Sequence, residues 1–186
     1  MMTYDEFLNK YSAEINSRDF SNPKFKEYYQ SIQSDRDFRF RIWNKFILDL
    51  IQLGINPLEK IESIPVEFFR GTGIEEMDIP NGVITIGDSS FRECPFLTKV
   101  VIPDSVKKVD DMAFYNCPDL REVSIGKGVE YIGYSIFGLC NNLLKVTYRG
   151  TKKEFWGLRK SGQWKGSVAL FDLIHCTDGG LEVSNE

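Results

Sequence analysis

The sequence lacks most of the residues and motifs on which catalysis depends. It contains a single histidine, His175, which adjoins Cys176. Adjacent residues of a strand point to opposite faces, so these two cannot form a dyad with each other, and no second histidine completes a metal site. The G-x-S-x-G, P-loop and G-x-G-x-x-G motifs are absent as well. We therefore expect a non-enzymatic protein with no catalytic residues, no metal and no cofactor.

Signals for export, membrane insertion or broad nucleic-acid binding are also missing. The first residues, MMTYDEFLNKYSAE, lack the basic and apolar regions of a secretory signal. No apolar run approaches the ~20 residues that a membrane span requires. The net charge of −4 lacks the basic excess typical of nonspecific nucleic-acid binders. These features predict a cytoplasmic protein that does not associate with membranes.

What the sequence does contain is one 23-residue unit written three times, in residues 83–105, 106–128 and 129–151. A shorter unit, residues 61–82, precedes them and carries Thr72 where the others have cysteine. The equivalent positions are Val83, Val106 and Val129; Ile86, Val109 and Ile132; Phe91, Phe114 and Phe137; Cys94, Cys117 and Cys140; Leu97, Leu120 and Leu143; Val100, Val123 and Val146; and Ile102, Ile125 and Tyr148. Such a period predicts a solenoid of about four coils.

Each unit ends in an L-x-x-V-x-I or L-x-x-V-x-Y segment whose residues alternate between apolar and polar. This alternation predicts a short strand, and stacking equivalent strands gives a parallel ladder over one continuous core. The half of the unit that holds Phe and Cys turns back as a short helix or an irregular loop. Pro95 and Pro118 follow two of the cysteines and would stop a helix there.

The pattern IGxxxFxxCxxLxxVxIPxSV resembles the BspA-type, or treponemal-type, bacterial leucine-rich repeats over residues 61–151. The resemblance implies a curved parallel solenoid with a protein-binding role and brings no catalytic residues. The later run YRGTKKEFW…IHCTDG resembles the closing segment of many repeat proteins of this family. This likeness suggests bacteria or their phages as the source.

Segments of different character flank the repeats. Residues 1–60 have helical start signals and apolar stripes, which predict an N-terminal helical domain that caps the first coil, binds a partner, or does both. Residues 152–186 predict a C-terminal cap, with a helix after the Thr151 capping box, a strand over 168–176, a turn over 177–180 and a returning strand from Leu181. The expected fold class is thus α+β, a short leucine-rich-repeat solenoid over residues 61–151 between these two parts.

Three of the four cysteines share one repeat column. Because the column lies in the expected core, we interpret them as buried structural thiols. A disulfide between neighbouring coils and a metal site are the alternatives, and the sequence has no C-x-x-C spacing to favour them.

The outward positions of the ladder are the first candidate binding site for a protein partner. One outward column alternates in charge from coil to coil. These charged side chains would fix the register of the strands or contact a partner. The candidate residues of this face are Glu76, Asp78, Lys99, Val101, Arg121, Glu122, Ser124, Leu144, Lys145 and Thr147.

A second candidate site lies in the helical domain, where basic and aromatic residues are interspersed. Such a cluster could meet phosphate or an acidic protein, although Asp35 and Asp37 interrupt it and solvated surface positions are the simpler interpretation. The candidate residues are Tyr29, Arg36, Arg39, Arg41 and Lys45.

These observations favour a protein–protein interaction module. We expect an intracellular inhibitor or adaptor, encoded by a phage or mobile element, that blocks a host defence or nucleic-acid enzyme in the manner of an anti-CRISPR protein. In that case it would act in the host-cell cytoplasm. The alternatives are a cell-surface adhesin of the BspA type and a nucleic-acid binder that uses the helical domain, whose affinity would fall steeply with salt.

Overall fold

A computed structural model describes residues 4–10, 43–164 and 174–181 of the chain. The chain divides into two compact units, Met1–Ile61 and Glu62–Glu186. The predicted boundaries at residues 60/61 and 151/152 stay predictions. Among the described residues, no helix combines the length and apolar character needed to cross a bilayer.

Two helices are described in the first unit, α1 (Tyr4–Lys10) and α5 (Asn44–Gln52). The helical spacing of Phe46, Ile47 and Leu50 places these apolar side chains on the buried face of α5. Gly54 follows the helix with φ of 69°, a left-handed conformation that glycine adopts without strain and that ends helices. One apolar stripe expected within residues 1–60 therefore lies on α5, whereas the helical domain as a whole stays a prediction.

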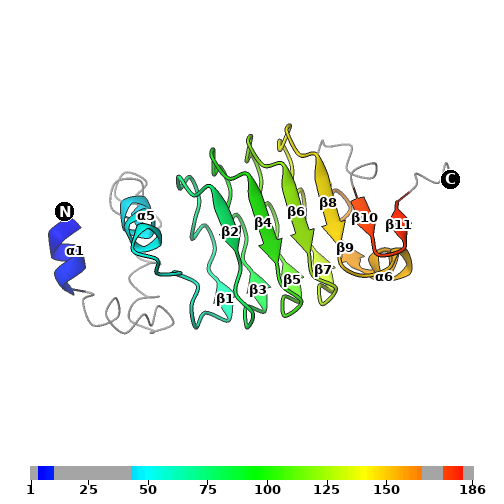
Figure 1. Ribbon diagram of the computed structural model, residues 1–186, viewed down its shortest axis with the longest axis horizontal. Helices are drawn as coiled ribbons and strands as arrows, with labels where there is room; N and C mark the ends of the chain where they lie inside the picture. The colour runs from blue at the N-terminus through cyan, green and yellow to red at the C-terminus, as the bar shows by residue number, and fades with distance from the viewer. Residues whose placement is uncertain (1–3, 11–42, 165–173, 182–186) are drawn as a thin grey trace. The chain divides into compact units, whose positions relative to one another are not determined.

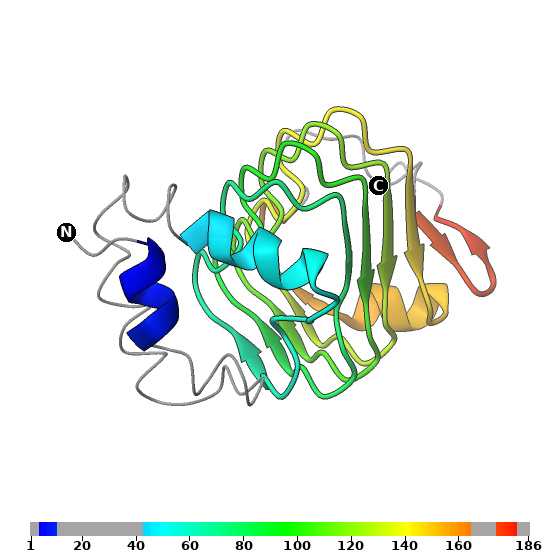
Figure 2. The same ribbon diagram turned by 60° about the vertical axis from the view of Figure 1, so that its left-hand side comes forward.

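The second unit is a parallel β-solenoid of four coils, each of which contributes one short and one long strand (Figure 1). The short strands form a five-stranded sheet in the order β1 (Ser63–Ile64), β3 (Thr85–Ile86), β5 (Lys108–Val109), β7 (Tyr131–Ile132) and β9 (Arg159–Lys160). The long strands form a six-stranded sheet in the order β2 (Glu76–Asp78), β4 (Lys99–Ile102), β6 (Glu122–Ile125), β8 (Lys145–Tyr148), β10 (Ile174–Cys176) and β11 (Gly179–Gly180). Figure 2 shows the coils nearly end on, with the two sheets on different sides.

The predicted ladder of long strands is confirmed in its register. Val100 pairs with Val123, which pairs with Val146, and all three side chains are buried. The residues between them face outward, as the alternation predicts. The sheet of two-residue short strands was not predicted, because in the sequence these strands leave only an apolar column at Ile86, Val109 and Ile132.

Aromatic rings stack through the core from one coil to the next. The ring centroids of Phe69 and Phe91 are 4.8 Å apart, those of Phe91 and Phe114 are 5.0 Å apart, and those of Phe114 and Phe137 are 5.8 Å apart. Pairs of this kind add about 0.5–1.5 kcal/mol each beyond the burial of their area. The phenylalanine column therefore helps to hold the coils in register.

The cysteine column links successive coils by hydrogen bonds. The thiols of Cys94, Cys117 and Cys140 are buried, and each donates to the carbonyl of a phenylalanine in the preceding coil at 3.0–3.1 Å. In the first coil Thr72 takes the cysteine position, and its hydroxyl donates to Phe69 O at 2.8 Å. The interpretation of these cysteines as buried core thiols is confirmed.

The half-repeat between the two strands is a series of turns, which resolves the alternative between helix and loop. Two residues per coil adopt positive φ, at equivalent positions in every coil. The two columns are Glu67, Ser89, Met112 and Ser135, and Gly71, Glu93, Asn116 and Leu139. Because non-glycine residues rarely adopt this conformation, the interlocked turns of neighbouring coils must hold it in place.

The C-terminal region continues both sheets. Helix α6 (Lys152–Gly157) begins at Thr151 with the predicted capping box to Glu154. After it, β9 pairs with β7 and β10 pairs with β8, both in parallel. The strand β11 is antiparallel to β10, but it is formed by Gly179–Gly180 rather than starting at Leu181 as predicted, because the turn needs only Thr177 and Asp178. Residues 168–173 of the predicted strand lie outside the described residues.

One buried hydroxyl in the coils is a source of instability. Ser90 is fully buried, and its Oγ has no hydrogen-bond partner among the described residues. The equivalent position in the next coil holds Ala113, also fully buried. We expect Ser90→Ala to raise the free energy of unfolding by about 1 kcal/mol, because an unsatisfied buried polar group costs ~1–3 kcal/mol. Chemical denaturation followed by circular dichroism measures the change.

The matched control is Ser105→Ala. The Ser105 hydroxyl donates to Val83 O at 2.8 Å and accepts from Gly82 N at 3.2 Å. Losing these bonds should lower the free energy of unfolding by about 1 kcal/mol. Changes of the same sign in both variants would contradict the assignment of Ser90 as unsatisfied.

Candidate functional site

The outer side of the long-strand sheet, which we call the sheet face, carries a column of four charges. Glu76 pairs in register with Lys99, Lys99 with Glu122, and Glu122 with Lys145, and all four side chains are exposed. Their sign alternates from strand to strand, as predicted. No ion pair joins them to one another or to other residues of the described part of the chain. The charges of this column are therefore directed to solvent.

A second column runs beside the charged one. Asp78 pairs with Val101, Val101 with Ser124, and Ser124 with Thr147, which brings all four predicted residues together. The column continues to His175 on β10, because Thr147 pairs with His175 and the imidazole is exposed. His175 was not predicted to belong to this face.

The remaining two predicted residues of the sheet face lie at its margin. Arg121 and Leu144 each directly precede a long strand, at equivalent positions of β6 and β8. Both are exposed, and 66% of the Leu144 side chain is accessible. The structure thus places all ten predicted residues on or beside one sheet.

The ends of the long strands border two open depressions, one at each end of the sheet face. The first, of about 540 Å³, is lined by residues that include Asp78, Lys99 and Asp104. The second, of about 690 Å³, is lined by residues that include Lys145 and His175. Arg149 lines both. It was not among the predicted residues, although the sequence offered one signal, since it takes the position of Pro103 and Gly126 in the earlier repeats.

Most of the predicted helical-domain site lies outside the described residues. This applies to Tyr29, Arg36, Arg39 and Arg41. Lys45 lies on α5, and its Nζ forms an ion pair with Asp49 Oδ2 at 3.0 Å. The site stays a prediction.

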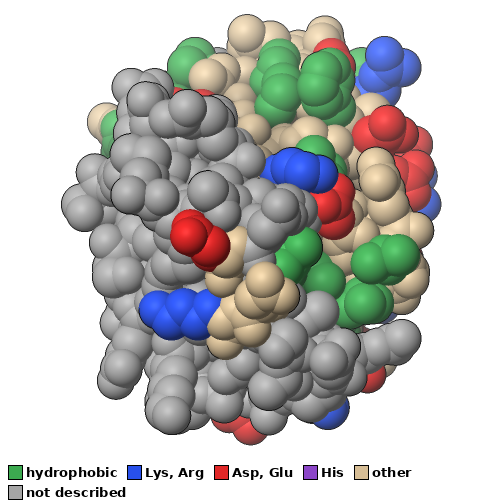
Figure 3. All heavy atoms as spheres, turned by 90° about the vertical axis from the view of Figure 1, so that its left-hand side faces the viewer, with side chains coloured by type: hydrophobic (Ala, Val, Ile, Leu, Met, Phe, Trp, Pro, Cys, Tyr) green, Lys and Arg blue, Asp and Glu red, His purple; other side chains and the backbone are tan. Residues whose placement is uncertain are grey.

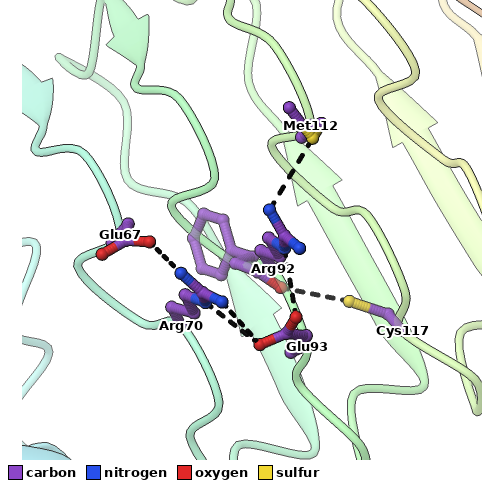
Figure 4. Close-up of polar contacts among 7 residues, drawn as sticks. Glu67, Arg70, Arg92, Glu93, Met112 and Cys117 are labelled. Atoms are coloured by element: carbon purple, nitrogen blue, oxygen red, sulfur yellow. Dashed lines mark hydrogen bonds and ion pairs between the residues drawn. The ribbon is translucent and has the colours of Figure 1, made fainter. Parts of the chain in front are cut away.

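A charged cluster on the turn side of the coils was not predicted (Figure 4). Arg70 contacts Glu67 and also Glu93, with Arg70 Nη2 3.0 Å from Glu93 Oε2. Arg92 Nε lies 3.2 Å from Glu93 Oε1, and its guanidinium carbon is 5.1 Å from the ring centroid of Tyr115. Because these charges already contact one another across two coils, the cluster stabilises the turns and offers no reactive group.

The pKa values of this cluster reflect the pairing. Burial raises the pKa of Glu93, but the hydrogen bond and charge of Arg70, with those of Arg92, outweigh it and lower the pKa below its usual value. Burial also lowers the pKa of Arg70, and its contacts with Glu67 and Glu93 reverse that effect and raise it. Glu93 and Arg70 are therefore both charged near neutral pH.

The buried thiol of Cys117 is poorly suited to nucleophilic chemistry. Hydrogen bonding with Cys140 and Cys94, together with burial, raises the pKa of Cys117 well above its usual value. Figure 4 shows its thiol directed at a main-chain oxygen of the neighbouring coil, which is Phe91 O. A thiol rather than a thiolate at neutral pH is a weak nucleophile. In the described ranges, no three His, Cys, Asp or Glu side chains gather as metal ligands.

The surface charge is mixed in sign. In the coloured part of Figure 3, Lys and Arg side chains lie among Asp and Glu side chains and hydrophobic groups.

Comparison with known proteins identifies the repeats. The BspA-type leucine-rich repeat region matches residues 52–156 in 6 copies. A crystal structure at 1.80 Å of a leucine-rich cell surface protein from Faecalibacterium prausnitzii A2-165 is 19% identical, with a TM-score of 0.37. The similarity covers 47% of this chain and 35% of that chain, so this chain spans about a third of that protein. No curated protein matches the chain.

The charged cluster predicts a pH-dependent contribution to stability. Because the pKa of Glu93 in the folded state lies below 4.5, its charge stabilises the fold above that pH, and the contribution is lost as the pH falls through the lowered pKa. Glu93→Gln should reduce the free energy of unfolding by roughly 1 kcal/mol at neutral pH, and the difference from the wild type should shrink below pH 4.5. Urea denaturation at several pH values measures this difference.

Glu130→Gln serves as the control, since Glu130 forms an ion pair with Lys107 in which both side chains are at least half exposed. We expect its effect to stay within about 0.5 kcal/mol at every pH. A loss of stability in Glu93→Gln that does not depend on pH would contradict the electrostatic account.

Proposed function

Because the chain belongs to the BspA-type leucine-rich repeat family, we propose that it is a non-enzymatic binding module whose partner is a protein. The sheet face is the surface proposed to make this contact. Parallel repeats present an extended surface of regularly spaced side chains, and such surfaces are the usual binding sites of repeat proteins. The ten residues predicted for the sheet face lie on or beside it, whereas the five predicted for the helical domain do not belong to it.

The alternating column of Glu76, Lys99, Glu122 and Lys145 is the observation that carries the proposal. The parallel pairing of the long strands holds these residues in register, yet in the described part of the chain none of the four forms an ion pair. Strand spacing sets the charges about 5 Å apart, which is a defined pattern for a partner to match. Complementary charge patterns of this kind mainly provide specificity and orient the partner on approach.

Within this class we favour an intracellular inhibitor or adaptor that acts by covering a surface of its partner. The free thiols support this choice, because cysteines persist unpaired in reducing compartments. The partner class that we propose is a host defence or nucleic-acid enzyme, and a phage or mobile element is the proposed source. An adhesin would instead meet its partner outside the cell.

A charge-inverted variant separates binding from register fixing. Exchanging the sign at all four positions, by Glu76→Lys, Lys99→Glu, Glu122→Lys and Lys145→Glu, preserves the alternation and the net charge. We expect the free energy of unfolding to stay within about 1 kcal/mol of the wild type, because every neighbouring pair keeps opposite signs. Binding to a partner captured from host-cell lysate should weaken at least about tenfold, as measured by titration calorimetry.

The control exchanges one pair on the short-strand side, with Lys107→Glu and Glu130→Lys, and should bind like the wild type. Unchanged affinity of the charge-inverted variant would remove the column from the binding site and leave it the role of fixing register. Capture of nucleic acid alone, lost at higher salt, would favour the nucleic-acid alternative. A partner found only on cell surfaces would favour the adhesin.

A further inference from the structure

The charged column of the sheet face has a symmetry of its own. Along β2, β4, β6 and β8, which lie side by side in Figure 1, the column reads Glu76, Lys99, Glu122 and Lys145. Read from the other end, the same column has the opposite sign at every position. A second copy of the column that runs in the reverse direction therefore offers Lys opposite each Glu and Glu opposite each Lys. An alternating column has this property only when the number of charges is even, as it is here.

A twofold axis can bring two such columns together with every charge matched. When the axis lies parallel to the strands and passes between β4 and β6, the two sheet faces meet and the second column runs in reverse. Glu76 then lies opposite Lys145 of the second copy, and Lys99 lies opposite Glu122 of the second copy. Because an interface of this symmetry is isologous, each of these contacts occurs twice, which gives four pairs of opposite charge.

Other arrangements of the two sheet faces place like charges together. An axis along the solenoid keeps the second column in the same direction, so Glu76 meets Glu76 and Lys99 meets Lys99. Moving the axis onto β4 or β6 also reverses every match, because the sign alternates from strand to strand. Like charges that face each other across an interface cost free energy and suppress such arrangements. The column therefore specifies both the direction and the register of a second copy.

The neighbouring column of the sheet face is compatible with the same axis. The axis places Asp78 opposite Thr147 and Val101 opposite Ser124, so no like charges meet. The Thr147 hydroxyl can donate to the Asp78 carboxylate in this arrangement. The side chains of this column are short, so the long side chains of the charged column set the distance between the faces. Stacked sheets lie ~10 Å apart, and a facing Lys and Glu together can span such a gap.

The charged column is held at a fixed spacing before a second copy arrives. Backbone pairing joins neighbouring strands, and Arg149 adds a link across two coils. It follows β8 in the fourth coil, and its Nη2 donates to Ile102 O in the second coil at 3.1 Å and lies 3.0 Å from Asp104 Oδ1. The coil between them has Gly126 at the equivalent position, so no side chain stands in the way. A surface that is already ordered loses less entropy on binding.

From this symmetry we infer that a second copy of the chain binds the sheet face, antiparallel to the first, around a twofold axis between β4 and β6. The inference rests on the proposed function in taking the sheet face as a binding surface, and it names a second occupant of that surface. Self-association covers the four charges that the proposed partner would contact, so the dimer and the partner complex exclude each other. Chain concentration then regulates how much of the protein is free to bind its partner.

The chemistry of this contact predicts a dimer that dissociates readily and is sensitive to salt. Exposed ion pairs are weak, and salt screens them, with a Debye length of ~10 Å at 0.1 M. Val101 is the one apolar side chain in the two columns from β2 to β8, so apolar burial adds little. Sedimentation velocity of the full chain at rising concentration should show a monomer–dimer equilibrium that shifts toward monomer as NaCl is added. A chain that stays monomeric up to millimolar concentration at low salt would overturn the inference, and so would a dimer that salt leaves unchanged.

Two variants of equal net charge separate contact between copies from repulsion within one copy. Glu122→Lys with Lys145→Glu gives the charge order −, +, +, −, which places like charges opposite each other at all four positions across the axis. We expect dimerisation to weaken at least about tenfold. The control, Lys99→Glu with Glu122→Lys, gives the order −, −, +, +. It puts more like charges side by side within one copy, yet it keeps every opposite pair across the axis and should dimerise like the wild type.

Equal dimerisation of these two variants would overturn the inferred axis. The charge-inverted variant keeps the inference testable even if one of them unfolds, which a thermal melt would reveal. Its column is again complementary to its own reversed copy, so it should dimerise like the wild type. Mixed with the wild type, it brings like charges together, and the mixed dimer should be at least about tenfold weaker than either parent dimer. Energy transfer between differently labelled chains measures the mixed dimer, and its formation in statistical proportion would contradict the inference.

Failure of the inference is distinct from failure of the proposed function. A wild-type chain that is always monomeric, but whose partner binding is lost in the charge-inverted variant, would refute the second copy and leave the proposed function in place. A charge-inverted variant that dimerises normally and binds the partner with unchanged affinity would do the reverse.

Discussion

Parallel hydrogen bonding between equivalent residues of successive coils is the constraint on which the rest of the structure depends. Ile84 N donates to Glu62 O, Lys107 N to Ile84 O, and Glu130 N to Lys107 O, so one position is linked through all four coils, and Arg159 N continues the series to Glu130 O. Each side chain consequently stacks on its own equivalent at the ~4.8 Å spacing of strands. Like groups that pack well together, such as phenylalanine rings and small thiols, suit such columns, whereas like charges would repel.

That constraint explains which parts of the fold could be predicted from the sequence. The long strands were predictable because the columns of Val100 and Ile102 repeat with a fixed period and alternate with exposed residues. The short strands hold two residues each and leave too little pattern to recognise. The turns were not predictable in detail, because positive φ at Ser89 and Met112 comes from the packing of neighbouring coils and not from glycine.

The residues of the candidate site also fall into those that the repeat pattern could predict and those that it could not. Residues that follow the repeat, such as Lys99 and Thr147, could be assigned to the sheet face from their column alone. Arg149 departs from its column, and its contact with Ile102 spans 47 residues, so only the three-dimensional structure reveals this contact. His175 lies beyond the last recognisable repeat. Its place on the sheet face is therefore known only from the parallel pairing of β10 with β8.

The reach of Arg149 across two coils has a consequence for how such a chain can change in length. Repeat proteins lengthen by duplicating whole units, and the hydrogen bonds between coils would accept an added copy almost anywhere. A copy inserted between β4 and β8 would carry Arg149 one strand spacing further from Asp104, beyond the span of its side chain. An added or deleted coil between these strands would therefore break both contacts of Arg149, whereas a coil added outside them would leave the contacts intact.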